Sequence, residues 1–209
     1  MNLKTLYEIF SRHPEGAWVL TPENAQLLYQ YIKNHSVKRI LDLGTGIGLS
    51  SSVVSLAMKD KKETDYHIDS IEQSDKCIAI ANQLIPEEFK NNLTIHKSEA
   101  VAWQTEKIPY RYFSVYGDLP EGEYDLIIND GPSMFMDGEN FIDLPNGVVH
   151  KLLLENKIKA GTQIIYDGRI ESLKFLERYF GDNFLITFVP PMGGDFNVLE
   201  RTQGDVIFK

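Results

Sequence analysis

The chain has 209 residues, of which 43% are hydrophobic and 24% charged, a size and composition suited to one compact domain over residues 1–209. Its net charge of -9 and pI near 5 disfavour nucleic acid as a partner, because proteins that bind phosphate backbones usually carry a basic face. The single cysteine excludes an intrachain disulfide, and no run approaches the roughly 18 apolar residues that a membrane span needs. Because the first 16 residues lack the apolar core of a signal peptide, a cytoplasmic location is expected.

The first part of the chain, residues 1–35, is predicted to be a helical lead-in to the core. Thr21 has the residue type of a helix N-cap, and Pro22 suits the first helical position. The lead-in is also a candidate lid, in which His13 and Trp18 would close over a substrate.

Beyond the lead-in, strand and helix patterns alternate through a predicted core of residues 36–209. Buried apolar runs predict strands over residues 38–44, 66–72, 93–97, 123–130 and 161–168. Helical periodicity predicts helices over residues 49–60, 74–85, 146–156 and 171–180, and a short helical turn over 98–104. The aromatic-rich segment 105–123 is predicted to be a loop. Strands without helices between them follow at residues 183–189, 196–202 and 205–209.

This order of elements predicts an α/β fold. Alternating strands and helices favour a doubly wound, mainly parallel seven-stranded sheet with helices on both faces. The helix-free strands at the end favour an antiparallel strand pair there.

Three glycines follow directly after the first predicted strand. The stretch Asp42 to Gly48 reads D-x-G-x-G-x-G, with glycines at Gly44, Gly46 and Gly48. Because ligands bind at the carboxyl ends of strands in such sheets, the glycines are expected to wrap a ligand. A dinucleotide-binding loop would need its third glycine where Leu49 stands. A tight turn without a ligand is the plain alternative.

Acidic residues follow the next two strands as well. Glu72 ends the second strand, where a carboxylate can accept both hydroxyls of a ribose. Glu99 follows the third strand and could accept a hydrogen bond from an adenine amine; an exposed acid at a helix start is the alternative. Three such acids, together with the glycine spacing, describe a nucleoside bound without a pyrophosphate.

This pattern resembles the class I S-adenosylmethionine-dependent methyltransferases, over about residues 20–190. The resemblance implies a Rossmann-like methyltransferase fold that ends in an antiparallel strand pair. It also implies that Asp42 faces the amino-acid end of the cofactor, that the glycines pass beneath it, and that Glu72 holds the ribose. The implied cofactor site comprises Asp42, Gly44, Thr45, Gly46, Gly48, Ser50, Glu72, Ser98, Glu99 and Asp130.

Within that family, the chain looks most similar to the catechol and caffeoyl-coenzyme A O-methyltransferase branch. That branch places a divalent metal on the acids that end strands four and five, here Asp130 and Asp167, and on a following Asn, with a Lys near the first acid. This sequence departs from the pattern, because Gly168 replaces the Asn and Ser133 stands in place of the Lys. A metal-free site is therefore favoured, in which Asp167 pairs with a cation such as Arg169 or caps a turn. A metal on the two acids is the alternative.

The expected reaction is methyl transfer to an oxygen of a small-molecule acceptor, which the sequence does not name. Asp130 is the first candidate for a general base and His150 the second. The stretch NDGPS after the fourth strand lacks the motif with which base methyltransferases hold a flipped base, which again disfavours nucleic acid. A nicotinamide-linked oxidoreductase and a non-catalytic nucleoside-binding module stay open as alternatives, and a homodimer is compatible with the sequence.

Overall fold

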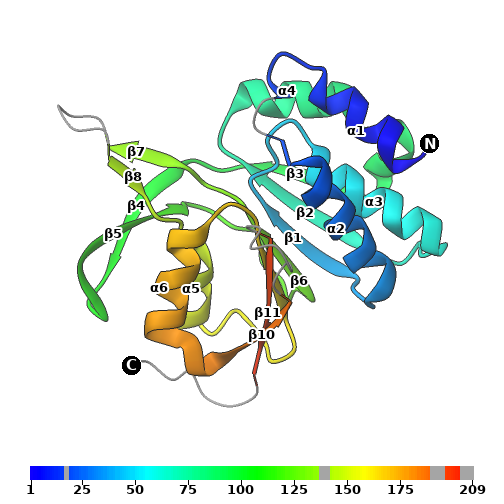
Figure 1. Ribbon diagram of the computed structural model, residues 1–209. Helices are drawn as coiled ribbons and strands as arrows, with labels where there is room; N and C mark the ends of the chain where they lie inside the picture. The colour runs from blue at the N-terminus through cyan, green and yellow to red at the C-terminus, as the bar shows by residue number, and fades with distance from the viewer. Residues whose placement is uncertain (17–18, 137–141, 189–195, 203–209) are drawn as a thin grey trace. The chain divides into compact units, whose positions relative to one another are not determined.

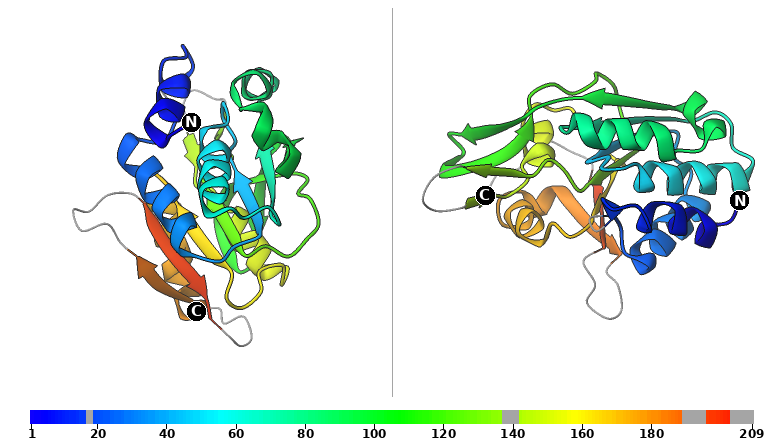
Figure 2. Two further views of the ribbon diagram at one scale, coloured as in Figure 1. Left: turned by 90° about the vertical axis from the view of Figure 1, so that its right-hand side faces the viewer. Right: turned by 90° about the horizontal axis from the view of Figure 1, so that it is seen from above.

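The computed structural model describes residues 1–16, 19–136, 142–188 and 196–202. The predicted strand at 205–209 and Trp18 of the candidate lid lie outside the described residues. The chain divides into two compact units, Met1–Lys97 and Ser98–Lys209, which are drawn in Figure 1 and from two further sides in Figure 2.

The first unit builds a parallel sheet of three strands, β1, β2 and β3, with β2 in the middle. Its elements are α1 (Leu3–Ser11), α2 (Pro22–Asn34), β1 (Arg39–Leu43), α3 (Leu49–Lys61), β2 (His67–Glu72), α4 (Asp75–Leu84), the 3-10 helix η2 (Glu87–Asn92) and β3 (Leu93–Lys97). Leu43 pairs with Ile71, and Glu72 pairs with Lys97. This register brings the carboxyl ends of all three strands to one edge.

The helices of this unit begin where the sequence predicts. Thr21 accepts a hydrogen bond from the Asn24 N–H at 3.1 Å, with Pro22 in the first turn, and so caps α2. Ser74 accepts from the Cys77 N–H at 3.3 Å at the start of α4. Helices α2 and α3 lie side by side (Figure 1), and α1 packs on both of them, with its apolar residues Leu6 and Phe10 fully buried.

The second unit combines a mixed sheet with two hairpins. Its elements are β4 (Ala100–Thr105), β5 (Ile108–Tyr116), β6 (Leu126–Asn129), β7 (Met134–Met136), β8 (Ile142–Leu144), α5 (Val148–Leu154), β9 (Gln163–Tyr166), α6 (Ile170–Phe180), the 3-10 helix η3 (Gly181–Asn183), β10 (Phe184–Phe188) and β11 (Asn197–Arg201). Strand β6 runs parallel to β9, whereas β11 lies between β9 and β10 and is antiparallel to both. Counted over both units, seven strands make up the predicted mainly parallel sheet, and β10 with β11 is the expected antiparallel pair.

One stretch of the prediction was wrong. Residues 98–104 do not form a helical turn, and most of 105–123 is not a loop, because β4 and β5 pair as an antiparallel hairpin. Trp103 lies opposite Phe113, with ring centroids 6.0 Å apart. Such aromatic cross-strand pairs stabilise a hairpin, and they override the weak helical pattern of a short segment. The hairpin β7–β8 was likewise not predicted.

Candidate active site

The turn after β1 is built from backbone groups. Gly44, Gly46 and Gly48 have φ values of 97°, 52° and 100°, in the region that side-chain-bearing residues rarely adopt. The N–H groups of Gly44 and Thr45 both donate to the carbonyl of Ile71 at 3.0 Å. The turn is therefore fastened to the neighbouring strand β2, as a ligand-binding loop at this edge requires.

Two of these glycines serve different ends. A side chain on Gly46 would meet no atom within 4 Å, so the space above this residue is open. A Cβ on Gly48 would instead lie 2.8 Å from the side chain of Ile85 and 3.3 Å from that of Ala81. Gly48 thus allows the start of α3 to pack closely against α4, whereas Gly46 leaves room beside the turn.

Asp42 is the next-to-last residue of β1 and is fully buried. Its Oδ2 accepts hydrogen bonds from the hydroxyls of Ser50 at 2.7 Å, Ser51 at 2.5 Å and Ser70 at 3.1 Å. A buried carboxylate needs such donors, since burying an unpaired charge is costly. The hydroxyls of Thr45 and Ser70 lie 2.6 Å apart in the same cluster. Asp42 therefore ties β1 to α3 and β2, and its predicted role toward the amino-acid end of a cofactor stays a prediction.

Glu72 lies at the end of β2 and reaches back to the glycine turn. Its Oε2 accepts from the Gly46 N–H at 2.8 Å, and its Oε1 accepts from the N–H groups of Gln73 at 2.9 Å and Ser74 at 2.8 Å. The residue is 7% exposed, so these bonds hold the carboxylate in one place. Each carboxylate oxygen can accept about two hydrogen bonds, which leaves Oε2 able to accept one from a ribose hydroxyl.

Ser98 and Glu99 open the β4–β5 hairpin rather than a helix. The Ser98 hydroxyl accepts from the Asp118 N–H at 3.0 Å, and the Glu99 carbonyl accepts from the Gly117 N–H at 2.9 Å. Ser98 is buried, whereas Glu99 is exposed. Both residues thus support the hairpin through these bonds, and the predicted contact of Glu99 with adenine stays a prediction.

The turn after β6 is held by side chains from distant parts of the second unit. Three successive carbonyls, those of residues 130–132, each accept a hydrogen bond from a side chain. Arg169 donates to the carbonyl of Asp130, Asn146 to that of Gly131 and Ser114 to that of Pro132. The position of the Asp130 carboxylate is therefore set by residues that lie 16 to 39 positions away in the sequence.

No family model and no curated protein sequence matches the chain. A methyltransferase from Podospora anserina, solved with bound SAH, is similar at a TM-score of 0.64 and 16% identity, over 97% of this chain and 88% of that one. An O-methyltransferase from Bacillus cereus in complex with SAH gives 0.60 and 15%, over 96% and 90%. The O-methyltransferase TomG from Streptomyces achromogenes, in complex with SAM, gives 0.59 and 13%, over 97% and 89%.

The chain has the class I methyltransferase fold. The likeness covers 97% of the chain and so extends over both units. The antiparallel pair β10 and β11 stands at the end of the chain, as the predicted fold requires. TM-scores of 0.59–0.64 establish the fold alone at identities of 13–16%, and the predicted fold class is confirmed.

Two positions of the metal site of the resembled branch differ in the second unit. Gly168, with φ of 66°, offers no side chain after Asp167. Arg169 places its Nε 3.3 Å from Oδ1 of Asp130, and the predicted role of Asp167, pairing with a cation such as Arg169 or capping a turn, stays a prediction. In the part of the chain that the structure describes, no three His, Cys, Asp or Glu side chains gather to hold a metal ion. The described residues therefore offer no ready set of ligands for a divalent metal, and a metal-free site stays a prediction.

His150 lies in the apolar interior of the second unit. It is fully buried in α5, with its ring 5.2 Å from that of Phe113 and 6.0 Å from that of Phe180, centroid to centroid. Neither ring nitrogen has a hydrogen-bond partner among the described residues, and burial lowers the pKa of His150 to about 3. A general base must contact the proton that it removes, so this position suits a core side chain and leaves Asp130 as the candidate base.

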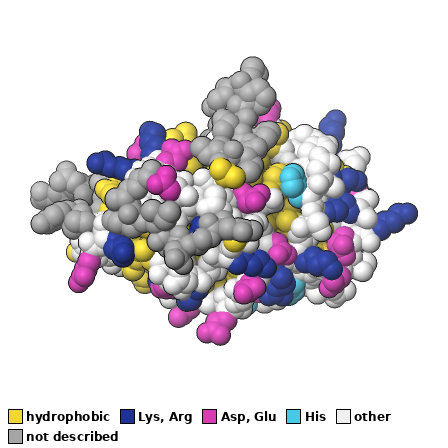
Figure 3. Space-filling model, turned by 90° about the horizontal axis from the view of Figure 1, so that it is seen from below, with side chains coloured by type: hydrophobic (Ala, Val, Ile, Leu, Met, Phe, Trp, Pro, Cys, Tyr) yellow, Lys and Arg dark blue, Asp and Glu magenta, His cyan; other side chains and the backbone are white. Residues whose placement is uncertain are grey.

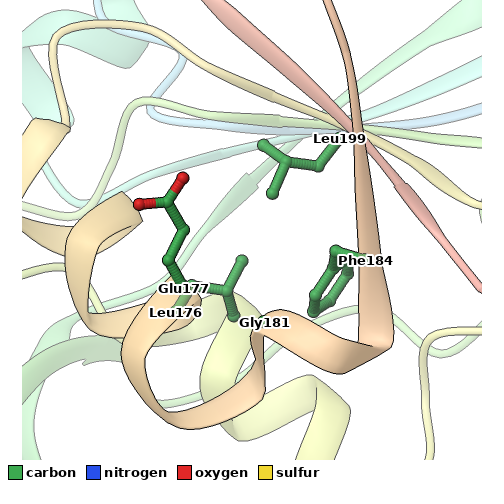
Figure 4. Close-up of a pocket in the computed structure, with 5 residues that line it drawn as sticks. All are labelled: Leu176, Glu177, Gly181, Phe184 and Leu199. Atoms are coloured by element: carbon green, nitrogen blue, oxygen red, sulfur yellow. The ribbon is translucent and has the colours of Figure 1, made fainter.

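A hollow also lies between α6 and the strands β10 and β11 (Figure 4). Its lining residues are Leu176, Glu177, Gly181, Phe184 and Leu199. Its volume of about 220 Å³ is below the roughly 300–1,000 Å³ of ligand pockets, and among the described residues that line it Glu177 alone is charged. The described lining residues bring no convergent polar groups to this hollow, and residues 130–133 are not among them.

Sequence reasoning missed three residues that hold the Asp130 turn. Ser114 lies in the segment 105–123 that is predicted to be a loop, and the sequence pattern marks Asn146 only as the start of a predicted helix. The sequence indicates Arg169 only as a possible partner of Asp167. None of the three stands in a motif, and only the folded arrangement of β5, α5 and α6 around β6 brings them together.

Proposed function

We propose that the chain is an S-adenosylmethionine-dependent methyltransferase that transfers a methyl group to an oxygen of a small molecule. The observation that carries this proposal is the bond from the Gly46 N–H to the Glu72 carboxylate at 2.8 Å. It joins the glycine turn to the acid that would hold the ribose, so the two predicted cofactor elements form one site. The solved structures with the same fold and bound SAH or SAM support the same cofactor.

Several features of the first unit favour a nucleoside over a dinucleotide. Leu49 stands where a dinucleotide loop has its third glycine, and it is 2% exposed, so its side chain fills the space that such a glycine keeps open. The open space beside Gly46 and the fixed carboxylate of Glu72 suit a ribose with its base. In this proposal the cofactor site is completed, with the roles that the resemblance implies, by Asp42, Gly44, Thr45, Gly48, Ser50, Ser98, Glu99 and Asp130.

The proposed reaction is an in-line displacement at the methyl carbon of the sulfonium. An acceptor oxygen forms the new C–O bond while the C–S bond breaks, and its electron pair goes to sulfur, which leaves S-adenosylhomocysteine. Most of the acceleration would come from holding donor and acceptor in line. The hydroxyl proton of the acceptor leaves to a base, for which we propose Asp130, with an expected gain of about 10²–10⁴-fold.

A small molecule is the proposed acceptor, in a cytoplasmic protein. On the face drawn in Figure 3, basic and acidic side chains are interspersed, and the net charge is -9, neither of which suits a phosphate backbone. No helix in the described ranges is long and apolar enough to cross a membrane.

Calorimetry tests the cofactor assignment. The purified chain is titrated with S-adenosylmethionine, S-adenosylhomocysteine and NADH, and we expect micromolar binding of the first two and weaker or no binding of NADH. Equal or tighter binding of NADH, or no heat with either sulfur compound, would refute the proposal. A second step incubates the chain with S-adenosylmethionine and a panel of hydroxyl compounds, and S-adenosylhomocysteine formation is measured by mass spectrometry. Binding without turnover on any acceptor would favour the non-catalytic nucleoside-binding module.

A further inference from the structure

The edge of the sheet in the second unit carries a cation of its own. Strands β6 and β9 are parallel neighbours, with Asn129 paired to Tyr166, so the acids that follow them, Asp130 and Asp167, come to the same edge. At this edge Arg169 makes its ion pair with Asp130, with Nε 3.3 Å from Oδ1. A guanidinium, rather than a cluster of oxygen ligands, therefore faces the first acid.

Several bonds fix this guanidinium. Its Nε donates to the Asp130 carbonyl at 2.6 Å, and its Nη2 donates to the same carbonyl and, at 2.9 Å, to the hydroxyl of Ser133. Ser133 stands where the resembled branch has its Lys. In this chain that position carries no charge of its own, and its hydroxyl accepts a hydrogen bond from the Arg169 guanidinium. The Arg169 side chain is 23% exposed, and a guanidinium stays charged at any working pH.

We propose that Arg169 is the resident cation of this site, that it excludes a divalent metal, and that it positions the Asp130 carboxylate for methyl transfer. This inference rests on the proposed function and extends it. A divalent metal prefers several oxygen ligands, and binding it to Asp130 would require the guanidinium to leave. One fixed positive charge thus takes the place of a metal. The acceptor therefore does not need two neighbouring oxygens with which to chelate a metal.

The fold offers a way to test the exchange of cations in both directions. Gly168 has φ of 66°, and Asn is among the few residues that tolerate this conformation, so Gly168→Asn restores the third ligand of the resembled branch without a forbidden backbone. Arg169→Met removes the charge and keeps a long side chain. Arg169→Lys keeps the charge. Arg178→Met is the matched control, because it removes another arginine of α6, one that lies over the ring of Tyr179.

The experiment titrates Mn²⁺ into the full chain and follows the free ion by electron paramagnetic resonance. We expect no binding above background in wild type, Arg169→Lys and Arg178→Met, and at least tenfold tighter binding in Gly168→Asn/Arg169→Met, lost again when Asp130→Asn is added. Tight Mn²⁺ binding by wild type that disappears in Asp130→Asn would overturn the proposal. So would a folded Gly168→Asn/Arg169→Met variant that binds no more Mn²⁺ than wild type.

Two further measurements separate this inference from the proposed function. Calorimetry with S-adenosylhomocysteine, the product of S-adenosylmethionine, is run on wild type and on every variant that keeps Asp130, and we expect unchanged affinity, because no residue of the predicted cofactor site is altered in them. Failure of all proteins to bind it would remove the proposed function and leave the Mn²⁺ result standing. Once an acceptor is found, turnover of wild type should be unaffected by EDTA, fall at least tenfold in Arg169→Met and recover in part in Arg169→Lys. Loss of wild-type turnover in EDTA, restored by Mg²⁺, would contradict the exclusion of metal.

Discussion

The turns after β1 and β6 both follow buried strands, yet they are fixed in opposite ways. The turn at Gly44–Gly48 is shaped by its own backbone, with three glycines at positive φ and its N–H groups bound to β2. The turn at residues 130–133 is held by side chains from β5, α5 and α6, one of them charged. The first arrangement leaves space for a ligand, whereas the second holds a carboxylate in place.

The glycines of the first turn give the largest expected effects, and two substitutions separate space from packing. Gly46→Val adds a β-branched side chain at φ of 52° where no atom lies within 4 Å, so it fills the space proposed for the cofactor. We expect affinity for S-adenosylmethionine to fall more than 100-fold, beyond the loss in Glu72→Ala, with a moderate loss of stability of about 1–3 kcal/mol. Calorimetry and urea unfolding measure the two effects.

Gly48→Ala is the matched change at the other side of the turn. Its Cβ would lie 2.8 Å from Ile85 at φ of 100°, so overpacking and strain combine. We expect a loss of about 2–4 kcal/mol in the free energy of unfolding, larger than for Gly46→Val. For the companion variant, Gly46→Val, wild-type folding and wild-type affinity for S-adenosylmethionine would mean that the glycines serve only the backbone conformation of the turn.

Glu72→Ala should weaken S-adenosylmethionine binding by about 10- to 150-fold, because it removes charge-assisted bonds worth about 1.5–3 kcal/mol. The same change frees the N–H groups of Gly46, Gln73 and Ser74, so the turn loses its support together with the ribose acid. Calorimetry measures the affinity, with Glu23→Ala, an exposed acid in α2, as control. An affinity within twofold of wild type would contradict the assignment.

The contrast between the turns explains what the sequence could predict. The glycine turn is a contiguous motif whose residues need particular φ values, so the spacing from Asp42 to Gly48 predicts the turn after β1. The roles of these residues and of Glu72 toward a cofactor stay a prediction. The strands, the helix caps at Thr21 and Ser74 and the antiparallel end followed from local patterns. The partners of Asp130 are single residues brought in by tertiary packing, and no local pattern marks Arg169 or Asn146. The β4–β5 hairpin was missed because its cross-strand pairs become visible only once the register is known.

Asn146→Ala tests the turn at residues 130–133 by removing an uncharged side chain that holds it. The Asn146 amide is 2% exposed, donates to the Gly131 carbonyl and accepts from the Val148 N–H at 3.0 Å. Its loss leaves two buried backbone groups without these partners, and we expect unfolding to become easier by about 1–3 kcal/mol. Urea unfolding measures this, with the exposed Gln104→Ala on β4 as control. S-adenosylhomocysteine affinity should be unchanged; a loss of affinity without a loss of stability would contradict a purely supporting role.

His150→Leu should have the smallest effect at pH 7.5 and a growing one in acid. The folded state keeps the ring neutral, with a pKa of about 3, whereas the unfolded chain takes up a proton near pH 6.5. The unfolded state thus binds more protons between these values, and wild type loses stability as the pH falls from 6.5 toward 3, by at most about 1.4 kcal/mol per pH unit. Leu removes this loss and two buried nitrogens without partners, so the variant should equal wild type at pH 7.5 within about 1 kcal/mol and exceed it increasingly at pH 6 and pH 5. Urea unfolding at the three pH values measures the difference. A folded variant that is no more stable than wild type at pH 5, or one that binds cofactor but loses all turnover, would return His150 to the list of catalytic candidates.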